Sequence, residues 1–278
     1  MTLAKTVTTL AACGALAACG GAKTGGTVTY DPVAVSDGLL ITKADDNLTR
    51  VFRSGTLISE PNDTKVGDAD QLPGPVTIRR NSATDTVRAV NANIFAVASA
   101  NQSFSGIGGA PSTNTAFGRF EADDLPQSGA AQMEGNYKGI LVDNTVIPGS
   151  QFIFYYVEGR ANIEANFEDG SITGTLSQRE LVNATSLTTV HAPVQNFQLS
   201  APEITPEGTF ESGLFAVSLP QQNSPIAAVK GTIAGVFGND PNNGPRVAGV
   251  VELEHAYGNG GTLTEVGAFS TDQSTVTP

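Results

Sequence analysis

The chain has 278 residues, with 15 Lys plus Arg against 27 Asp plus Glu and a formal net charge of -12. Its densest basic spot is no larger than the pair Arg79-Arg80. Phosphate binding needs clustered Lys and Arg, so this distribution of charge excludes a nucleic-acid-binding protein. Only 15% of the residues are charged, whereas 31 are glycine, and this balance favours short strands and tight turns over amphipathic helices. The length is sufficient for one large β domain or two smaller ones.

Residues 1–18 have the composition of a signal peptide. Lys5 supplies the positive charge of the n-region, and the stretch from Thr6 to Ala18 is uncharged and rich in Ala and Leu. That stretch is too short to span a bilayer, which needs about 20 apolar residues. We therefore predict a secretory signal at this end.

Both cysteines lie in the same local sequence, Leu-Ala-Ala-Cys-Gly, which is similar to a bacterial lipobox. Cleavage before Cys13 would leave only Thr6 to Leu10 as the apolar core, below the usual ~7–15 residues. Cys19 is therefore predicted to carry the lipid that anchors the protein to the membrane, with residues 19–26 as a flexible leash. Gly20 in place of Asp indicates the outer membrane. The alternative is an ordinary signal peptide with incidental cysteines.

The next region, from Thr27 to about Leu125, is irregular. Short apolar pieces such as Val76-Thr77-Ile78 and Ile94-Phe95-Ala96-Val97 alternate with long polar stretches. These pieces predict short strands of a small sheet with large loops. The glycine-rich stretch from Ser99 to Pro126 is typical of a linker or loop.

From Gly135 onward the pattern becomes regular. Apolar and polar residues alternate strictly from Ala161 to Phe167, which predicts a strand with one buried face. Asp169-Gly170 follows, and Asp-Gly between alternating runs is a strong hairpin signal. About eight strands fit between Tyr137 and Phe269, enough to close into a small barrel. The side chains expected to fill it are Ile163, Phe167, Ile172, Leu176, Phe197, Leu199, Val251 and Leu253.

Three motifs in this region resemble the transferrin-binding protein B-like family of bacterial surface lipoproteins. Leu125-Pro126-Gln127-Ser128-Gly129, followed by Gly135-Asn136-Tyr137-Lys138-Gly139, is similar to the family's barrel entry. The segment from Ala161 to Thr175 resembles its strand, hairpin and strand unit. Gly231 to Gly238, Gly249-Val250-Val251 and Gly267-Ala268-Phe269 are similar to its closing strands.

The resemblance implies an all-β fold, with a β-rich handle region over residues 27–125 and an eight-stranded antiparallel up-and-down barrel over residues 126–278. It also implies a non-catalytic binding module for a protein partner, with nutrient (iron) acquisition as the expected role. The chain has room for one such lobe, where the transferrin receptors carry two. Two alternatives stay open: a lipocalin-like carrier of a small ligand such as haem, and a structural envelope lipoprotein.

No residue pattern predicts catalysis, a metal site or a cofactor. The chain has two histidines, His191 and His255, and each is expected to be a satisfied surface residue. After processing, no cysteine is free to act as a nucleophile, and no motif of a serine hydrolase or zinc protease is present.

One stretch, Gln151 to Val157, is apolar on both faces, which a half-buried barrel strand should not be. Two interpretations stay open. Phe152, Phe154, Tyr155 and Tyr156 are candidate contacts for a protein partner, because aromatic side chains are favoured interface anchors. Alternatively, these side chains are buried against the handle region.

Overall fold

The computed structural model describes fifteen stretches of the chain: residues 28–30, 39–44, 47–53, 56–59, 64–65, 76–81, 84–91, 93–101, 113–120, 124–143, 155–199, 203–216, 226–240, 242–257 and 262–277. All regular structure in them is strand. Among these residues, no helix has the length and apolar character needed to cross a membrane. The predicted signal peptide and the leash lie outside the described residues.

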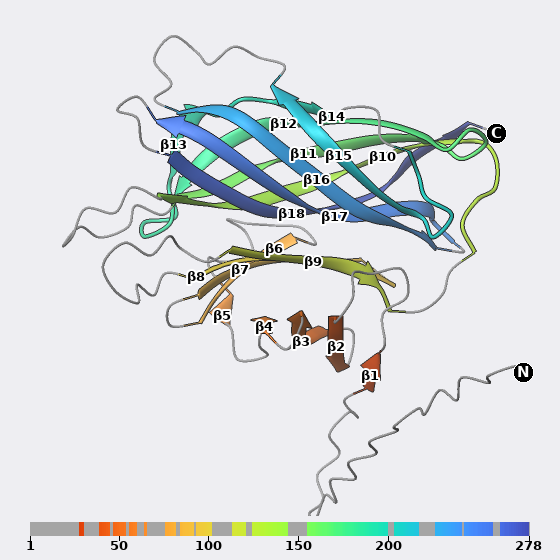
Figure 1. Ribbon diagram of the computed structural model, residues 1–278, viewed down its shortest axis with the longest axis horizontal. Helices are drawn as coiled ribbons and strands as arrows, with labels where there is room; N and C mark the ends of the chain where they lie inside the picture. The colour runs from red at the N-terminus through yellow and green to blue at the C-terminus, as the bar shows by residue number, and fades with distance from the viewer. Residues whose placement is uncertain are drawn as a thin grey trace, which may run out of the picture.

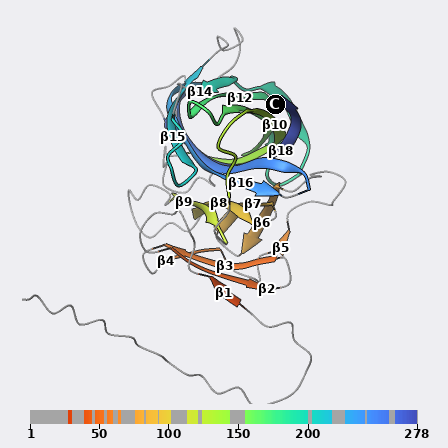
Figure 2. The ribbon, with the colours of Figure 1, turned by 90° about the vertical axis from the view of Figure 1, so that its right-hand side faces the viewer.

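The C-terminal half is a closed antiparallel barrel. Its strands are β10 (Ala130–Asp143), β11 (Tyr155–Asn166), β12 (Ser171–Asn183), β13 (Thr189–Pro193), β14 (Phe197–Leu199), β15 (Thr209–Ala216), β16 (Ile226–Asp240), β17 (Gly244–Tyr257) and β18 (Thr262–Thr277). Consecutive strands pair with each other, except that β13 and β14 both pair with β12 and not with one another, and β18 returns to β10 to close the ring. Figure 2 looks down the axis of the barrel, so that the ring of strands is seen end-on. The predicted eight-stranded up-and-down barrel is confirmed.

Alternation of side chains builds the barrel wall. Seven of the eight residues predicted to point inward are buried in one cluster, and Phe167 packs against it. The seven are Ile163, Ile172, Leu176, Phe197, Leu199, Val251 and Leu253. The hairpin between β11 and β12 turns at Gly170, which has a φ of 71°, a left-handed conformation that favours glycine. The Asp169 carboxylate accepts a hydrogen bond from the Ser171 N–H at 2.9 Å.

Two further sheets form the handle, which we define as strands β1 to β9. The five-stranded sheet comprises β5 (Thr64–Lys65), β6 (Val76–Asn81), β7 (Thr84–Asn91), β8 (Ile94–Asn101) and β9 (Thr113–Arg119). The four-stranded sheet comprises β1 (Val28–Tyr30), β2 (Leu39–Ala44), β3 (Asn47–Arg53) and β4 (Thr56–Ser59). Figures 1 and 2 show the five-stranded sheet directly beneath the barrel and the four-stranded sheet below it.

A second hydrophobic core joins the handle to the outer wall of the barrel. Its handle side includes Val76, Ile78, Val87 and Ile94, and its barrel side includes Ile140, Val236, Val250 and Val266. Strand β8 is buried from Ile94 to Ala100 on both faces, because the barrel covers one face and strand β4 approaches it from the handle. This double burial explains why β8 is a continuous apolar run.

The structure corrects the predicted linker from Ser99 to Pro126. Strand β9 lies inside that stretch and pairs with β8 along its length. Its sequence is rich in Thr and Asn and gives a weak strand signal. Strand β9 is nevertheless held by the ladder to β8 and by burial of Thr115 and Ala116, so tertiary packing overrides local preference. The predicted boundary at residues 125–126 falls between β9 and β10.

Candidate functional site

The lumen of the barrel is filled by its own side chains. Besides the predicted residues, Tyr137, Phe210, Phe237 and Phe269 are at most 2% exposed. Glycines in the wall make room for these rings: a Cβ on Gly249 would lie 2.5 Å from the Phe269 ring. A small eight-stranded barrel has an interior just wide enough for such filling. The lumen therefore has the character expected of a packed core.

Two pockets lie at opposite ends of the barrel. One, of about 390 Å³, is lined at the start of β10 and the β11–β12 hairpin by residues including Gln132, Glu164 and Thr173. The other, of about 410 Å³, is lined by residues of β16 to β18 that include Lys230 and Glu254. Both are open to solvent, whereas a carrier of haem or lipid requires an enclosed, apolar cavity.

A charged cluster lies inside the lumen, centred on the carboxylate of Glu265. Arg179 Nη2 donates to both of its oxygens, at 2.6 Å for Oε2. Tyr137 donates its hydroxyl proton to Oε1 at 2.5 Å, and His255 Nε2 lies 2.8 Å from Oε2. All four side chains are at most 1% exposed. The cluster links strands β10, β12, β17 and β18 through one carboxylate.

A β-bulge turns Arg179 into the lumen. Along β12 the inward side chains are at even positions up to Leu176, but Arg179 and Leu181 follow at odd ones. The register shifts between these two sets, and Gln178 has a φ of 51°. Such an extra residue re-aims the side chain that follows it. The guanidinium then stacks on Tyr137 and Phe197, 5.6 and 4.8 Å from the ring centroids.

The electrostatics of the cluster favour an ionised Glu265. Burial alone would raise the pKa of this carboxyl, but the charge of Arg179 and the hydrogen bond from His255 outweigh it and hold the pKa well below its ordinary value of 4.5. The same carboxylate keeps the pKa of Arg179 raised despite the opposing effect of burial. Burial and the nearby carboxylate raise the pKa of Tyr137. Arg179 and Glu265 therefore form a buried ion pair whose charges offset each other, and Tyr137 and His255 donate hydrogen bonds to the same carboxylate.

This lowered pKa makes the stability of the barrel depend on pH in a defined direction. The carboxyl of Glu265 is more acidic in the folded chain than in the unfolded chain. Its contribution is therefore complete at neutral pH and is lost as the pH falls through and below 4.5. In urea unfolding across that range, the wild type should lose stability more steeply than Glu265→Gln, by up to about 1.4 kcal/mol per pH unit. Parallel pH profiles for the two proteins would contradict this assignment.

Sequence reasoning missed this cluster, and the structure corrects the expectation for His255. We expected a surface histidine, but its side chain is 1% exposed and faces Glu265. His191 lies in β13, and its side chain is outside the described part of the structure. No group of three or more metal-ligating side chains occurs among the described residues.

The four candidate partner residues, Phe152, Phe154, Tyr155 and Tyr156, do not form one exposed surface in the described part of the structure. Phe152 and Phe154 lie outside the described residues, and Tyr155 is partly buried against the lumen core. Tyr156 is fully buried on the opposite side of the strand. Its hydroxyl donates to the Asp85 carboxylate of the handle at 2.9 Å and accepts from Arg80 at 2.5 Å. Tyr156 thus contacts the handle, as the alternative interpretation predicted, and is not accessible to a partner.

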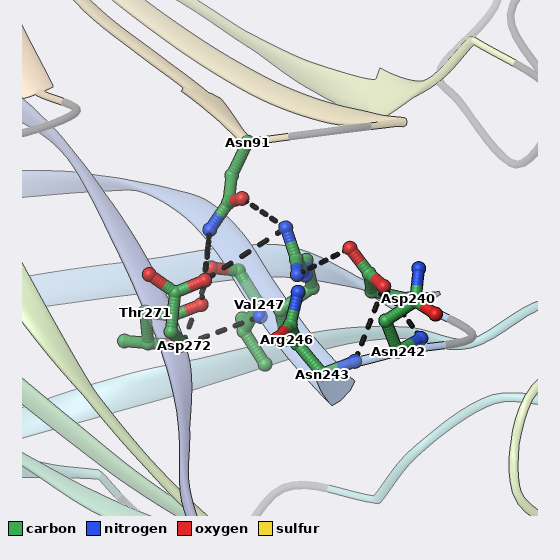
Figure 3. Close-up of polar contacts among 8 residues, drawn as sticks. All are labelled: Asn91, Asp240, Asn242, Asn243, Arg246, Val247, Thr271 and Asp272. Carbon is green, nitrogen blue, oxygen red and sulfur yellow. Dashed lines mark hydrogen bonds and ion pairs between the residues drawn. The ribbon is translucent and has the colours of Figure 1, made fainter.

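A second polar contact fixes the handle at the other end of the barrel. The amide of Asn91, at the end of β7, accepts a hydrogen bond from Arg246 and donates one to Asp272 at 2.8 Å (Figure 3). Arg246 also pairs with Asp240 at 2.7 Å. The pKa of Asp240 is lowered, first by the Asn242 N–H and also by Asn243 and Arg246. The contact of Asn91 and the contact of Tyr156 therefore hold the handle at both ends of the barrel.

No protein-family model matches the sequence, and no curated protein does either. Solved structures similar to this chain include intact Ap-TbpB with its N and C lobes, at 16% identity and a TM-score of 0.43. A single and a double mutant of the vaccine antigen transferrin-binding protein B from Haemophilus parasuis Hp5 match at 12% and 13% identity, with TM-scores of 0.44 and 0.39. The matches cover 84–89% of this chain but 44–50% of those chains, so this chain spans about half their length. They are structures of the family that the sequence motifs resemble.

Proposed function

We propose that this chain is a lipid-anchored protein of the bacterial outer membrane whose handle and barrel present a binding surface to a protein partner, without catalysis. The observation that carries the proposal is the filled lumen. Large side chains and the cluster around Glu265 occupy the space in which a carrier would hold its ligand. Binding is then left to the outer surface and to the connections between strands.

The construction of the lobe supports this role. The barrel is closed, so it exposes no long sheet edge, and the handle is fixed to it by a shared core and by polar contacts at both ends. A rigid scaffold of this kind lowers the entropy that its connections lose when they bind. A purely structural protein would need no such presentation of loops.

Phe152 and Phe154 are the proposed partner contacts, and capture of binding proteins tests them. The full-length protein in detergent would be used as bait, beside a variant with Phe152→Ser and Phe154→Ser. The double variant should lose the captured partner, with a loss of about 2 kcal/mol or more for each true anchor. A matched control, Glu168→Ser with Glu207→Ser, changes two exposed residues in the β11–β12 and β14–β15 connections. This variant should still capture the partner. Capture of no protein by either bait contradicts the proposed function.

Anchoring depends on Cys19. Replacing Cys19 with alanine removes the thiol that would carry the lipid, so the protein should be released from membranes or remain as an unprocessed precursor. Cys13→Ala should change little, because Cys13 would lie within the signal peptide that cleavage before Cys19 removes. Membrane fractionation with lipid labelling checks both variants. Normal retention and labelling of Cys19→Ala would rule out this anchor.

A further inference from the structure

One line in the barrel wall is joined by few backbone pairs. Strands β10 and β11 pair without interruption from Ala130 to Leu141. Among the described residues, two pairs join β12 to β14, namely Thr175 with Gln198 and Leu176 with Phe197, and the pairing of β12 with β13 is irregular. We call this line, between β12 and residues 193–199, the seam; Figure 2 shows it between the labels β12 and β14. Local opening of a sheet costs least where its ladder is shortest.

Arg179 holds both sides of the seam together. It follows the bulge in β12, and its carbonyl accepts a hydrogen bond from the Val194 N–H at 3.1 Å. Its Nη1 donates to the Gln195 carbonyl at 2.5 Å, and its guanidinium lies 4.8 Å from the centroid of the Phe197 ring. One residue of β12 therefore makes the contacts to residues 194–197 that a regular ladder makes elsewhere in the wall.

An ion pair across the lumen keeps Arg179 in this position. Glu265 lies on β18, which is separated from β12 by β11 and β10. Its Oε2 accepts a hydrogen bond from Arg179 Nη2 at 2.6 Å, and both side chains are at most 1% exposed. A guanidinium without this anion would not remain buried at the seam, because a buried charge needs its partner.

We propose that the barrel wall opens along the seam and that the ion pair of Arg179 with Glu265 is the latch that keeps it closed. Opening separates β12 from residues 194–199 and exposes one edge of β12 together with the lumen side chains Phe197 and Leu199. The ladders from β15 through β18 and β10 to β12 stay intact. The latch belongs to the barrel itself and acts whether or not a protein partner is bound.

Acid releases this latch. Among the described residues, the charged and titratable groups that face Glu265 are Arg179 from β12, Tyr137 from β10 and His255 from β17. Burial opposes ionisation, but the charge of Arg179 and the hydrogen bond from His255 lower the pKa of Glu265 below 4.5 in the closed barrel. Opening separates the pair and returns that pKa toward 4.5. The latch therefore holds at higher pH and weakens below 4.5, by up to about tenfold per pH unit.

Hydrogen exchange measured by mass spectrometry on the full-length protein in detergent tests the latch. The quantity is the exchange rate of residues 194–199 divided by that of residues 247–253 in β17, each corrected for its rate in the unfolded chain. At neutral pH this ratio should exceed about ten, because β17 is paired on both sides. It should rise by up to about tenfold more between about pH 4.5 and about pH 3.5. In Glu265→Gln it should be higher than in the wild type at neutral pH and insensitive to acid.

Two disulfides provide a matched test of the position of the opening. Thr175 and Gln198 lie opposite each other across the seam and face outward, so Thr175→Cys with Gln198→Cys bridges the seam without entering the lumen. Glu164→Cys with Thr173→Cys is the control, because these exposed residues join β12 to β11 on its other side. The seam disulfide should lower the exchange ratio by about tenfold or more until it is reduced. The control disulfide should leave the ratio unchanged.

Three results would overturn the inference. Equal exchange of the two segments, at neutral pH and in acid, would show that the barrel opens only as a whole. Equal slowing by the two disulfides would show that the opening does not lie between β12 and β14. An acid-induced rise that persists in Glu265→Gln would show that another group, such as His255, controls the opening.

Discussion

Replacement of Arg179 with methionine is expected to destabilise the protein by about 3–5 kcal/mol, because it leaves the carboxylate of Glu265 buried without its cation. The methionine keeps apolar contact with Phe197, so the loss reports mainly on charge. The free energy of unfolding in urea measures it. Arg179→Met with Glu265→Leu removes both charges and should recover most of the stability, since a buried pair can be replaced by apolar side chains at little cost.

An exposed ion pair provides the control for this experiment. Lys230 and Glu254 lie 2.8 Å apart with side chains 75% and 40% exposed, so Lys230→Met should leave the unfolding curve unchanged. If Arg179→Met behaved like Lys230→Met, the cluster would not be buried and closed as described. If the double variant were as unstable as the single one, the hydrogen bonds of Tyr137 and His255 to Glu265 would be the larger contribution.

Replacement of Ile163 with aspartate is expected to cost about 4 kcal/mol or more, or to prevent folding. Ile163 is fully buried in the lumen, and a carboxylate there would have no partner. Gln198→Asp is the matched control, because Gln198 faces solvent between the buried residues Phe197 and Leu199. That change should cost less than about 0.5 kcal/mol. Thermal melting distinguishes them, and equal shifts would mean that the assignment of inward and outward faces is wrong.

The regular part of the barrel could be predicted because its signals are local. Strict alternation from Ala161 to Phe167 and the Asp169-Gly170 turn each determine one step of the fold, and all predicted lumen residues lie where expected. Strand β9 could not be predicted in this way, because its pairing with β8 and its contact with the barrel wall are formed only in the tertiary structure.

Part of the cluster around Glu265 could have been predicted from the sequence. His255 continues the inward series Val251 and Leu253, and Glu265 has the same parity as Leu263 and Phe269. Extending each alternation by one step would have placed both inside the barrel. Arg179 is different, because the bulge at Gln178 reverses the parity of β12, and no pattern in the sequence marks that bulge.

The aromatic run from Phe152 to Tyr156 shows the limit of composition as a guide. An apolar run on both faces of a strand predicts two buried faces as readily as it predicts a partner contact. Tyr155 packs inward and Tyr156 packs on the handle, which is a consequence of the handle's position beneath the barrel. The position of one domain against another is not encoded in the periodicity of either.

Native mass spectrometry of the purified protein tests the central claim, that the lumen is filled by its own side chains and holds no small molecule. The protein would be released from detergent in the mass spectrometer under gentle conditions, and its mass would be compared before and after denaturation. We predict the same mass in both states, equal to the polypeptide with its lipid anchor. A non-covalent ligand that is present in the native spectrum and lost on denaturation, such as haem or a fatty acid, would contradict the claim and favour a carrier.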